Sequence, residues 1–198
     1  LSPLVISLTD SEEHLKIRNA LNASLSDTNL DSIDTVAETI FPQSLYSFEK
    51  KDRQKLYENY LNKVLPRLKK IDQRNACGTY FQRMINYVDA DVNQLEIVIN
   101  SLIAKNVKRR SKLQISIFDP LWDHKSGMFQ GFPCLQHITF YKSETGGLII
   151  NSFYAIQYFY QRAYGNWLGL INLGKFVAEQ ANIPFEGFNC FIGVEKMD

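Results

Sequence analysis

Cys134 is one of three cysteines in this chain, with Cys77 and Cys190, and a cysteine side chain can do covalent chemistry. Even at its ordinary pKa a few per cent of a thiol is thiolate, and the thiolate is a strong nucleophile. Arg109 and Arg110 form an adjacent pair that could bind an anion, because the planar fork of arginine suits bidentate contacts with phosphate. Each feature has an ordinary alternative. A cysteine with apolar neighbours is commonly a core residue, and a basic segment is commonly a solvated loop.

Three further polar residues could contact a ligand or carry protons. Asn166 offers an amide with both a donor and an acceptor, although asparagine is also a favoured N-cap for the helix expected directly after it. Glu38 could act in proton transfer or lie exposed on a helix. Tyr80 could contribute its hydroxyl to a site or be a core tyrosine with a satisfied hydroxyl. Cys77 and Cys190 are expected in the core.

The part of the chain before residue 110 carries mainly helical signals. Residues 4–8 favour a short strand, and Thr9 and Glu12 then show the spacing of a capping box. Helical spacing of apolar residues predicts helices over residues 9–25, 31–40, 52–70 and 92–104. The second of these should end before Pro42, because proline disfavours a helical residue before it. The basic residues of the third are interleaved with acids, so we interpret them as a solvated face.

Beyond residue 110 the pattern changes to that of strands. Alternating, β-branched and aromatic residues predict strands over residues 111–118, 135–141, 148–160 and 188–194, with a glycine-containing turn at 142–147. A long helix is expected over residues 167–181, ended by Pro184. Helices first, and then an antiparallel-leaning sheet with a helix across it, describe a single α+β domain over residues 1–198.

The order of several motifs resembles that of the thymidylate synthases. Residues 91–99 read D-x-x-Q-L-x-x-V-I and lead to Arg109-Arg110, a strand, Pro133-Cys134, a hairpin and finally Asn166 before a long helix. The resemblance covers about residues 72–194 and rests on this order, since each motif alone is weak. It implies a thymidylate-synthase-like α+β fold, with a mixed or antiparallel sheet and helices packed on one side.

The resemblance also implies a chemistry. In that superfamily a cysteine thiolate adds to C6 of a pyrimidine nucleotide, so that C5 can attack a one-carbon donor, which is methylenetetrahydrofolate. Cys134 would be this nucleophile, Glu38 would manage protons at O4 through water, and Tyr80 would lie near the cysteine. Arg109 and Arg110 would bind the nucleotide phosphate of the neighbouring subunit, in a homodimer with shared active sites. Asn166 would contact the base edge, where asparagine instead of aspartate favours uracil over cytosine.

Several positions depart from the family pattern. Counting back eleven residues from Asn166 reaches Ala155, where the resemblance implies an arginine that binds phosphate. Ile156 and Tyr158 replace a serine and the aspartate that contacts the folate pterin. Residues 160–162 (Y-Q-R) resemble this motif but lie too close to Asn166, so we interpret them as unrelated to it. These losses argue against ordinary folate binding.

Two more departures lie beside the cysteine and at the end of the chain. Leu135 stands where the family usually has a histidine, and His137 occupies a different position on the strand. The His-x-Tyr that binds ribose in the family falls at residues 196–198. The segment that closes over the ligands in the family would follow, so we expect it to be lacking here. Such a lid excludes water during the reaction, and without it turnover should be poor unless another subunit or an extension of the chain substitutes.

Two functions remain open. The first is a transferase that adds a methyl or hydroxymethyl group to C5 of a pyrimidine nucleotide monophosphate through Cys134. The second is a non-catalytic thymidylate-synthase-like domain that binds a nucleotide or a protein partner, since a fold does not imply an activity. The cysteine, the double arginine and Asn166 favour the first function, and the lost ligand contacts favour the second.

Composition limits the partners and the compartment. With 198 residues and 45% hydrophobic content the chain can bury one substantial core. The 22 basic and 21 acidic residues nearly cancel, so neither nucleic-acid nor membrane binding is expected. No run approaches the roughly 20 apolar residues that cross a bilayer. Three cysteines without a CxxC or a histidine cluster predict neither a disulfide framework nor a metal site, and we expect a cytoplasmic protein.

Overall fold

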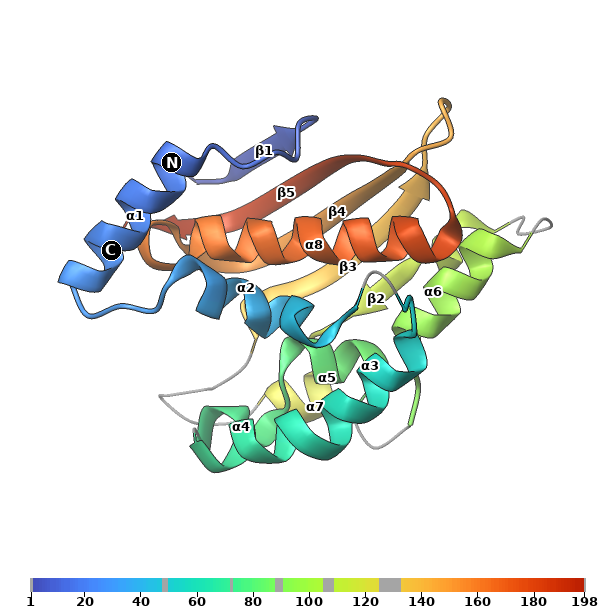
Figure 1. Cartoon of the computed structure of the whole chain (residues 1–198), viewed down its shortest axis with the longest axis horizontal. Helices are drawn as coiled ribbons and strands as arrows, with labels where there is room; N and C mark the ends of the chain where they lie inside the picture. Colours follow the sequence, from blue (N-terminus) through green and yellow to red (C-terminus); the bar gives the residue numbers. More distant parts are fainter. Residues whose placement is uncertain are drawn as a thin grey trace.

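The computed structural model describes residues 2–47, 50–71, 73–87, 91–104, 109–124 and 133–197. Within these ranges the chain forms a five-stranded sheet and a set of helices (Figure 1). The strands are β1 (Leu4–Leu8), β2 (Gln114–Ser116), β3 (Leu135–Lys142), β4 (Leu148–Tyr158) and β5 (Phe185–Lys196). Their order across the sheet is β1-β5-β4-β3-β2.

The sheet is mixed. Neighbouring strands pair antiparallel except β4 and β5, which run parallel. Parallel neighbours need a crossover connection, and the long helix α8 (Tyr164–Ala181) provides it. The predicted α+β class is therefore confirmed. β2 is shorter than the predicted strand because Arg110–Lys112 forms a 3-10 turn.

The other helices in the described ranges are mostly short. They are α1 (Leu15–Asp27), α2 (Ile33–Ile40), α3 (Arg53–Asn59), α4 (Leu65–Ile71), α5 (Tyr80–Ile85), α6 (Gln94–Ile103) and α7 (Pro120–Asp123). A π-helical segment, Tyr60–Val64, joins α3 to α4, so the predicted helix over 52–70 exists but is locally widened. None of the described helices is long and apolar enough to cross a membrane.

The predicted start of the first helix is wrong. α1 begins at Leu15, and the residues before it are irregular. The backbone N–H of Glu12 donates to the Asp10 carboxylate at 2.9 Å. An aspartate that bonds the amide two residues on stabilises a turn at the expense of a helix. This local bond explains why the spacing of Thr9 and Glu12 does not produce a capping box.

Helix α8 lies along one face of the sheet and packs against α2 (Figure 1). Gly165 and Gly169 permit the close approach of the two helices. A Cβ atom at Gly165 would lie 2.6 Å from the Cβ of Val36, and one at Gly169 would lie 2.7 Å from the carbonyl oxygen of Ala37. Both distances are too short for non-bonded heavy atoms, so this interface requires glycine at both positions.

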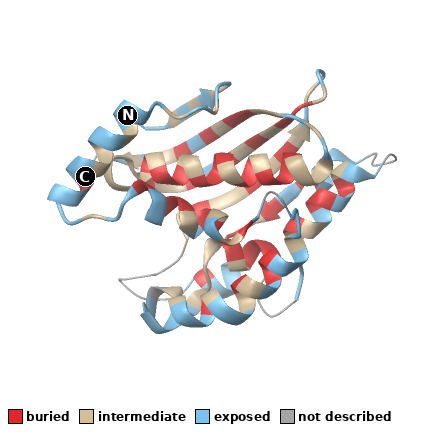
Figure 2. Cartoon of the chain, viewed as in Figure 1, coloured by how far each residue is buried: buried red, intermediate tan, exposed pale blue. Residues whose placement is uncertain are grey.

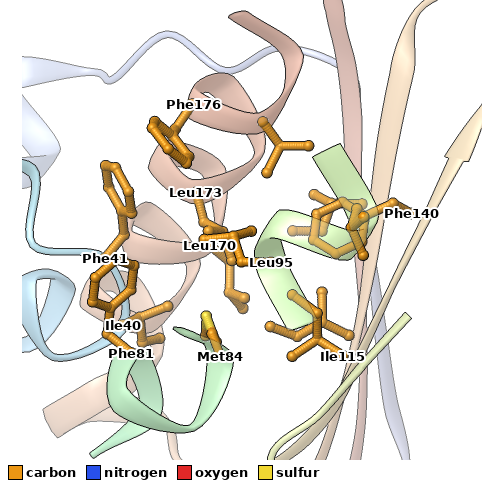
Figure 3. Packing of buried hydrophobic residues seen from close by; sticks show 14 of the residues in the cluster. Ile40, Phe41, Phe81, Met84, Leu95, Ile115, Phe140, Leu170, Leu173 and Phe176 are labelled. Atoms are coloured by element: carbon orange, nitrogen blue, oxygen red, sulfur yellow. The ribbon is translucent and has the colours of Figure 1, made fainter. Parts of the chain in front are cut away.

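The hydrophobic core lies between α8, the shorter helices and the covered face of the sheet (Figure 2). Figure 3 shows Phe41 next to Phe176 of α8, with Phe81, Met84 and Leu95 nearby, and all five are fully buried. The ring centroids of Phe41 and Phe176 are 5.0 Å apart. The core thus joins the helices of the first half of the chain to the strands of the second half.

The opposite side of the sheet, which we call the open face, stays partly exposed. Phe153 of β4 and Phe191 of β5 stack there, with ring centroids 5.5 Å apart. They are 40% and 41% exposed, and Val5 of β1, which pairs with Phe191, is 66% exposed. His137 of β3 pairs with Phe153 in the same row. The open face therefore presents an apolar row that crosses the strands.

A polar row lies beside the apolar row on the open face. Ser7 donates its hydroxyl to the Asn189 amide oxygen at 2.7 Å. The Asn189 amide nitrogen donates to Asn151 at 2.8 Å, and that of Asn151 donates to the Thr139 hydroxyl at 3.1 Å. These bonds link β1 to β5, β5 to β4 and β4 to β3, which is the order of the strands across the sheet. A one-residue slip would turn these side chains into the core, so the row specifies the register.

Candidate active site

A cavity of about 500 Å³ lies where the sheet meets the helices of the first half of the chain. The start of β3 and the end of β4 form one side of it. A π-helical segment between β4 and α8, Phe159–Ala163, forms a second side together with the start of α8. The cavity brings together three of the six predicted site residues, Tyr80, Cys134 and Asn166.

Cys134 immediately precedes β3 and is half-buried at the cavity wall. Its carbonyl oxygen accepts a hydrogen bond from the backbone N–H of Ala155 at 3.0 Å, which ties the residue to β4. Burial raises the pKa of the Cys134 thiol, and the positive charge of Arg162 opposes this shift. The thiol is therefore held mainly protonated at neutral pH, next to a cation that favours the thiolate.

Tyr80 is the first residue of α5, positioned by the Thr79 cap. Its hydroxyl lies within hydrogen-bonding reach of the backbone amides of Leu135 and Cys134. Burial and the nearby Cys134 raise the pKa of Tyr80 to about 12, although those amides oppose the shift. Tyr80 is thus a neutral phenol beside the thiol, so it can donate a proton or a hydrogen bond but does not act as a base.

Asn166 lies in the first turn of α8 and is 7% exposed. The alternative that it caps the helix is wrong, because the π-helical segment extends the helical backbone N-terminally and the cap position is Ala163. Among the described residues no hydrogen bond of the Asn166 amide is found. A buried amide that borders a cavity in this way has both its donor and its acceptor available to a ligand.

Glu38 is held outside the cavity. Its carboxylate accepts hydrogen bonds from the backbone N–H of Ser44 at 2.9 Å and from the Ser44 hydroxyl at 2.8 Å. The next residue along α2, Thr39, does line the cavity. Glu38 would reach a ligand there only after leaving Ser44, so in this conformation the carboxylate stabilises the turn after α2.

Arg109 and Arg110 are exposed and lie just before β2. β2 pairs antiparallel with β3, and Gln114 lies opposite Thr139. At about 3.4 Å a residue, Thr139 is about 17 Å along the strand from Cys134. The structure therefore does not bring the double arginine to the cavity within one chain. The neighbouring Lys105 and Lys108 of the basic segment lie outside the described residues.

Arg162 and Gln161 line the cavity. From the sequence alone, we interpret residues 160–162 as unrelated to the motif of the family. The strand ends at Tyr158, and the π-helical turn that follows brings both side chains to the wall of the cavity. Arg162 forms an ion pair with Asp31 at 2.9 Å. Ile156 and Tyr158, which replace the serine and aspartate implied by the resemblance, line the cavity as well. In the sequence, the only sign of a role for Arg162 is that it lies in an aromatic segment. Whether its side chain reaches the cavity depends on the π-helical turn.

A second arginine of the cavity, Arg83, is already neutralised. It is 4% exposed and donates to both carboxylate oxygens of Asp123, at 2.5 and 2.7 Å. It also donates to the carbonyl oxygens of Ile117 and Cys77. The Arg83 guanidinium thus joins α5 to α7 and to the end of β2, and we interpret it as structural.

Leu135 is fully buried, and His137 lies in the open-face row and not in the cavity. Burial lowers the pKa of His137, so this imidazole is neutral at physiological pH. The described ranges contain no group of three or more His, Cys, Asp or Glu side chains that could hold a metal ion. Among the described residues, the cavity thus offers a ligand the Cys134 thiol, the phenols of Tyr80 and Tyr158, and the Arg162–Asp31 pair.

No known family model matches this chain, and no curated protein matches it either.

Proposed function

We propose that the chain is a divergent member of the thymidylate synthase superfamily that adds a one-carbon unit to C5 of a pyrimidine nucleotide. The observation that carries this proposal is the convergence of Cys134, Tyr80 and Asn166 on one cavity. These residues come from three separate parts of the chain, and the resemblance assigns each of them to the active site. The mixed sheet with a long helix across it is compatible with the fold that the resemblance implies.

The proposed reaction begins with attack of the Cys134 thiolate on C6 of the pyrimidine. A sulfur–carbon bond forms, and the electron pair of the C5–C6 double bond makes C5 nucleophilic. C5 would then attack the carbon of the donor and lose its proton to solvent, and the donor's carrier would leave as its bond to the transferred carbon breaks. Water would add to that carbon to give a hydroxymethyl group, or a hydride from the reduced donor would give a methyl group, and the sulfur–carbon bond would break to return the thiolate. The Asn166 amide would hold the base edge through one donor and one acceptor. Tyr80, with a pKa of about 12, would supply a hydrogen bond next to the sulfur.

The resemblance makes methylenetetrahydrofolate the first candidate for the carbon donor. The cavity offers Tyr158 where the resemblance implies the aspartate that contacts the pterin. A tyrosine hydroxyl does not replace a carboxylate as an acceptor for a pterin amine. The described residues therefore do not fit the folate contact that the family uses, and the donor has to be tested separately from the nucleotide.

The open face supports a homodimer. Its stacked Phe153 and Phe191 expose apolar surface across the middle of the sheet, and contiguous exposed apolar patches commonly mark protein interfaces. In the dimer that the resemblance implies, a second copy of the chain would contribute its own Arg109 and Arg110 to the first protomer. The two arginines are exposed and available for such a role, which would give each cavity phosphate contacts from its partner.

A non-catalytic nucleotide-binding or protein-binding domain is the second candidate. Two observations favour it. Burial raises the pKa of Cys134, which lowers the fraction of nucleophilic thiolate. Glu38, the proposed proton carrier, is bound to Ser44. A domain of this kind would keep the nucleotide contacts of Asn166 and lack turnover.

Release of tritium from C5 distinguishes the two candidates. The protein is incubated with deoxyuridylate or deoxycytidylate labelled with tritium at C5, with and without methylenetetrahydrofolate. We expect release that is abolished in Cys134→Ser and retained in Cys77→Ser, a control that alters another half-buried thiol. If neither nucleotide releases label, yet one of them raises the melting temperature, the binding domain is the better description. If there is neither release nor a thermal shift, both candidates fail.

A further inference from the structure

Asp31 and Arg162 meet at the edge of the cavity. Arg162 comes from the π-helical segment after β4, and Asp31 lies in the connection between α1 and α2. The guanidinium Nη2 and the carboxylate Oδ2 are 2.9 Å apart, and both residues line the cavity. The two side chains are 36% and 48% exposed, so solvent reaches the pair.

Both arginines of the cavity wall are paired with a carboxylate. Among the described residues that line it, the charged ones are Asp31, Arg83 and Arg162. Arg83 is buried and bound through both terminal nitrogens to Asp123 and to backbone carbonyls. Arg162 is therefore the lining cation that can exchange its partner, because its ion pair is solvent-accessible and a guanidinium carries five N–H donors.

The Asp31 side chain can leave this ion pair without disturbing the core. Asp31 is an exposed residue outside any helix or strand. The next residue, Ser32, caps α2 through its own hydroxyl, which accepts from Thr35 at 3.1 Å. Rotation of the Asp31 carboxylate away from Arg162 breaks one solvated ion pair and leaves this cap in place.

We propose that Asp31 occupies, in the free protein, the position on Arg162 that the phosphate of a nucleotide ligand takes, so that ligand binding displaces Asp31. Asp31 is then an internal competitor that lowers the affinity of the cavity for phosphate. This inference deepens the proposed function and relies on it for the nucleotide, but not for the anion. A dianionic phosphate can form two parallel bonds with the guanidinium fork, which lets it compete with one carboxylate contact.

Arg162 also acts on Cys134, because both residues line the cavity and the charge of Arg162 opposes the rise in the thiol pKa. Arg162 favours the thiolate, and Asp31 partly cancels the charge of Arg162. The other titratable groups that interact with the thiol are the phenols of Tyr80 and Tyr154, and both phenols have raised pKa values. They are neutral at physiological pH, so they do not offset a change at Arg162. Removing the Asp31 charge should therefore lower the thiol pKa, and removing Arg162 should raise it.

The first test compares binding of deoxyuridylate, deoxyuridine and inorganic phosphate by calorimetry, in wild type, Asp31→Asn and Arg162→Gln. Solvated ion pairs of this kind are weak, so we expect Asp31→Asn to tighten deoxyuridylate and phosphate binding by about two- to fivefold. Arg162→Gln should weaken both by about tenfold or more, since a hydrogen-bonded charge contact is lost. Deoxyuridine, which has no phosphate, should bind all three proteins alike.

Asp34→Asn is the matched control. Asp34 lies nearby on α2, pairs with Arg18 and is not part of the cavity wall. The same loss of one negative charge there should change phosphate binding little. The proposal is overturned if Asp34→Asn has the effect of Asp31→Asn, if deoxyuridine responds as deoxyuridylate does, or if phosphate binds none of the proteins.

The second test measures the rate of Cys134 alkylation by iodoacetamide as a function of pH, in a Cys77→Ser background. The midpoint should fall in Asp31→Asn and rise in Arg162→Gln, which a merely structural role of the pair would not produce. Failure of tritium release together with tighter phosphate binding in Asp31→Asn would refute the enzyme and leave the competitor intact. An unchanged midpoint in both variants would refute the proposed coupling to the thiol.

Discussion

The ion pair between Arg83 and Asp123 provides the most direct test of the packing around the cavity. Asp123 is 3% exposed and Arg83 is 4% exposed. Asp123→Asn keeps the shape of the side chain but removes its negative charge, which leaves the Arg83 guanidinium buried without a counter-ion. Removing one partner of a buried pair typically costs about 3–5 kcal/mol. One of the Asp123 oxygens also accepts a hydrogen bond from the backbone N–H of Asp119 at 2.8 Å. The Asp123 carboxylate thus also stabilises the start of α7.

For a chain of this size each kcal/mol shifts the melting temperature by about 2–4 °C. Asp123→Asn should therefore lower it by about 6–20 °C, and chemical denaturation should show a matching loss in the free energy of unfolding. Asp34→Asn again serves as a control, because that carboxylate is 65% exposed and such pairs contribute about 0–1 kcal/mol. An apolar double replacement, Arg83→Met with Asp123→Leu, should be less damaging than the single change.

Two results would refute this reasoning. The first is a loss below about 1 kcal/mol in Asp123→Asn, which would mean that the charge of Arg83 is solvated or compensated by other groups. The second is a double variant that is less stable than the single variant. That outcome would assign the stability to the hydrogen bonds from Arg83 to the carbonyl groups of Ile117 and Cys77, and not to charge pairing.

Three further changes test other parts of the structure. Gly165→Ala would place a methyl group 2.6 Å from Val36, so we expect a loss of about 1–3 kcal/mol in thermal unfolding. Phe153→Asp should convert a dimer to a monomer in sedimentation experiments, and Leu121→Asp, at an 88% exposed site, should not. Tyr60 has a pKa of about 12, raised from 10.0 by burial. Its contribution to stability is full below pH 10 and is lost as the pH rises through about 12, so unfolding titrations of Tyr60→Phe should show a smaller decline over that interval.

These expectations can each fail separately. An unchanged melting temperature in Gly165→Ala would show that α2 and α8 can separate without cost. A wild-type protein that sediments as a monomer would remove the dimer from the proposal. A decline in Tyr60→Phe as steep as in wild type would assign the alkaline sensitivity to other groups.

Much of the fold could be predicted from the sequence because it depends on local patterns. The strand at residues 4–8, the helix that ends before Pro42 and the hairpin of β3 and β4 follow from alternation, proline and glycine. The start of α1 could not be predicted, because the bond from Glu12 to Asp10 competes with the helix. The parallel pairing of β4 with β5 is also not a local property, since it depends on how α8 returns the chain to the sheet.

The candidate site was predictable only in part, for a related reason. Cys134, Tyr80 and Asn166 carry recognisable chemistry and lie together in the structure. Arg162 was missed because a π-helical turn has no apolar periodicity that would reveal it in a sequence. Counting residues locates a side chain only where the strand or helix is regular. Across a π-helical turn the count no longer tells which residue faces the cavity. Glu38 illustrates the converse case, since its residue type suits catalysis but a local bond to Ser44 directs it elsewhere.

The position of β5 between β1 and β4 has a consequence for synthesis of the protein on the ribosome. β1 emerges before the other described strands, yet its only partner among them is β5, which is made after the other four. Ser7 and Asn189, which meet in the polar row, are 182 positions apart in the chain. β1 must therefore wait without this partner until the segment up to β5 has been translated. Its short length and its Ser7 limit the danger of pairing with a neighbouring nascent chain during that interval.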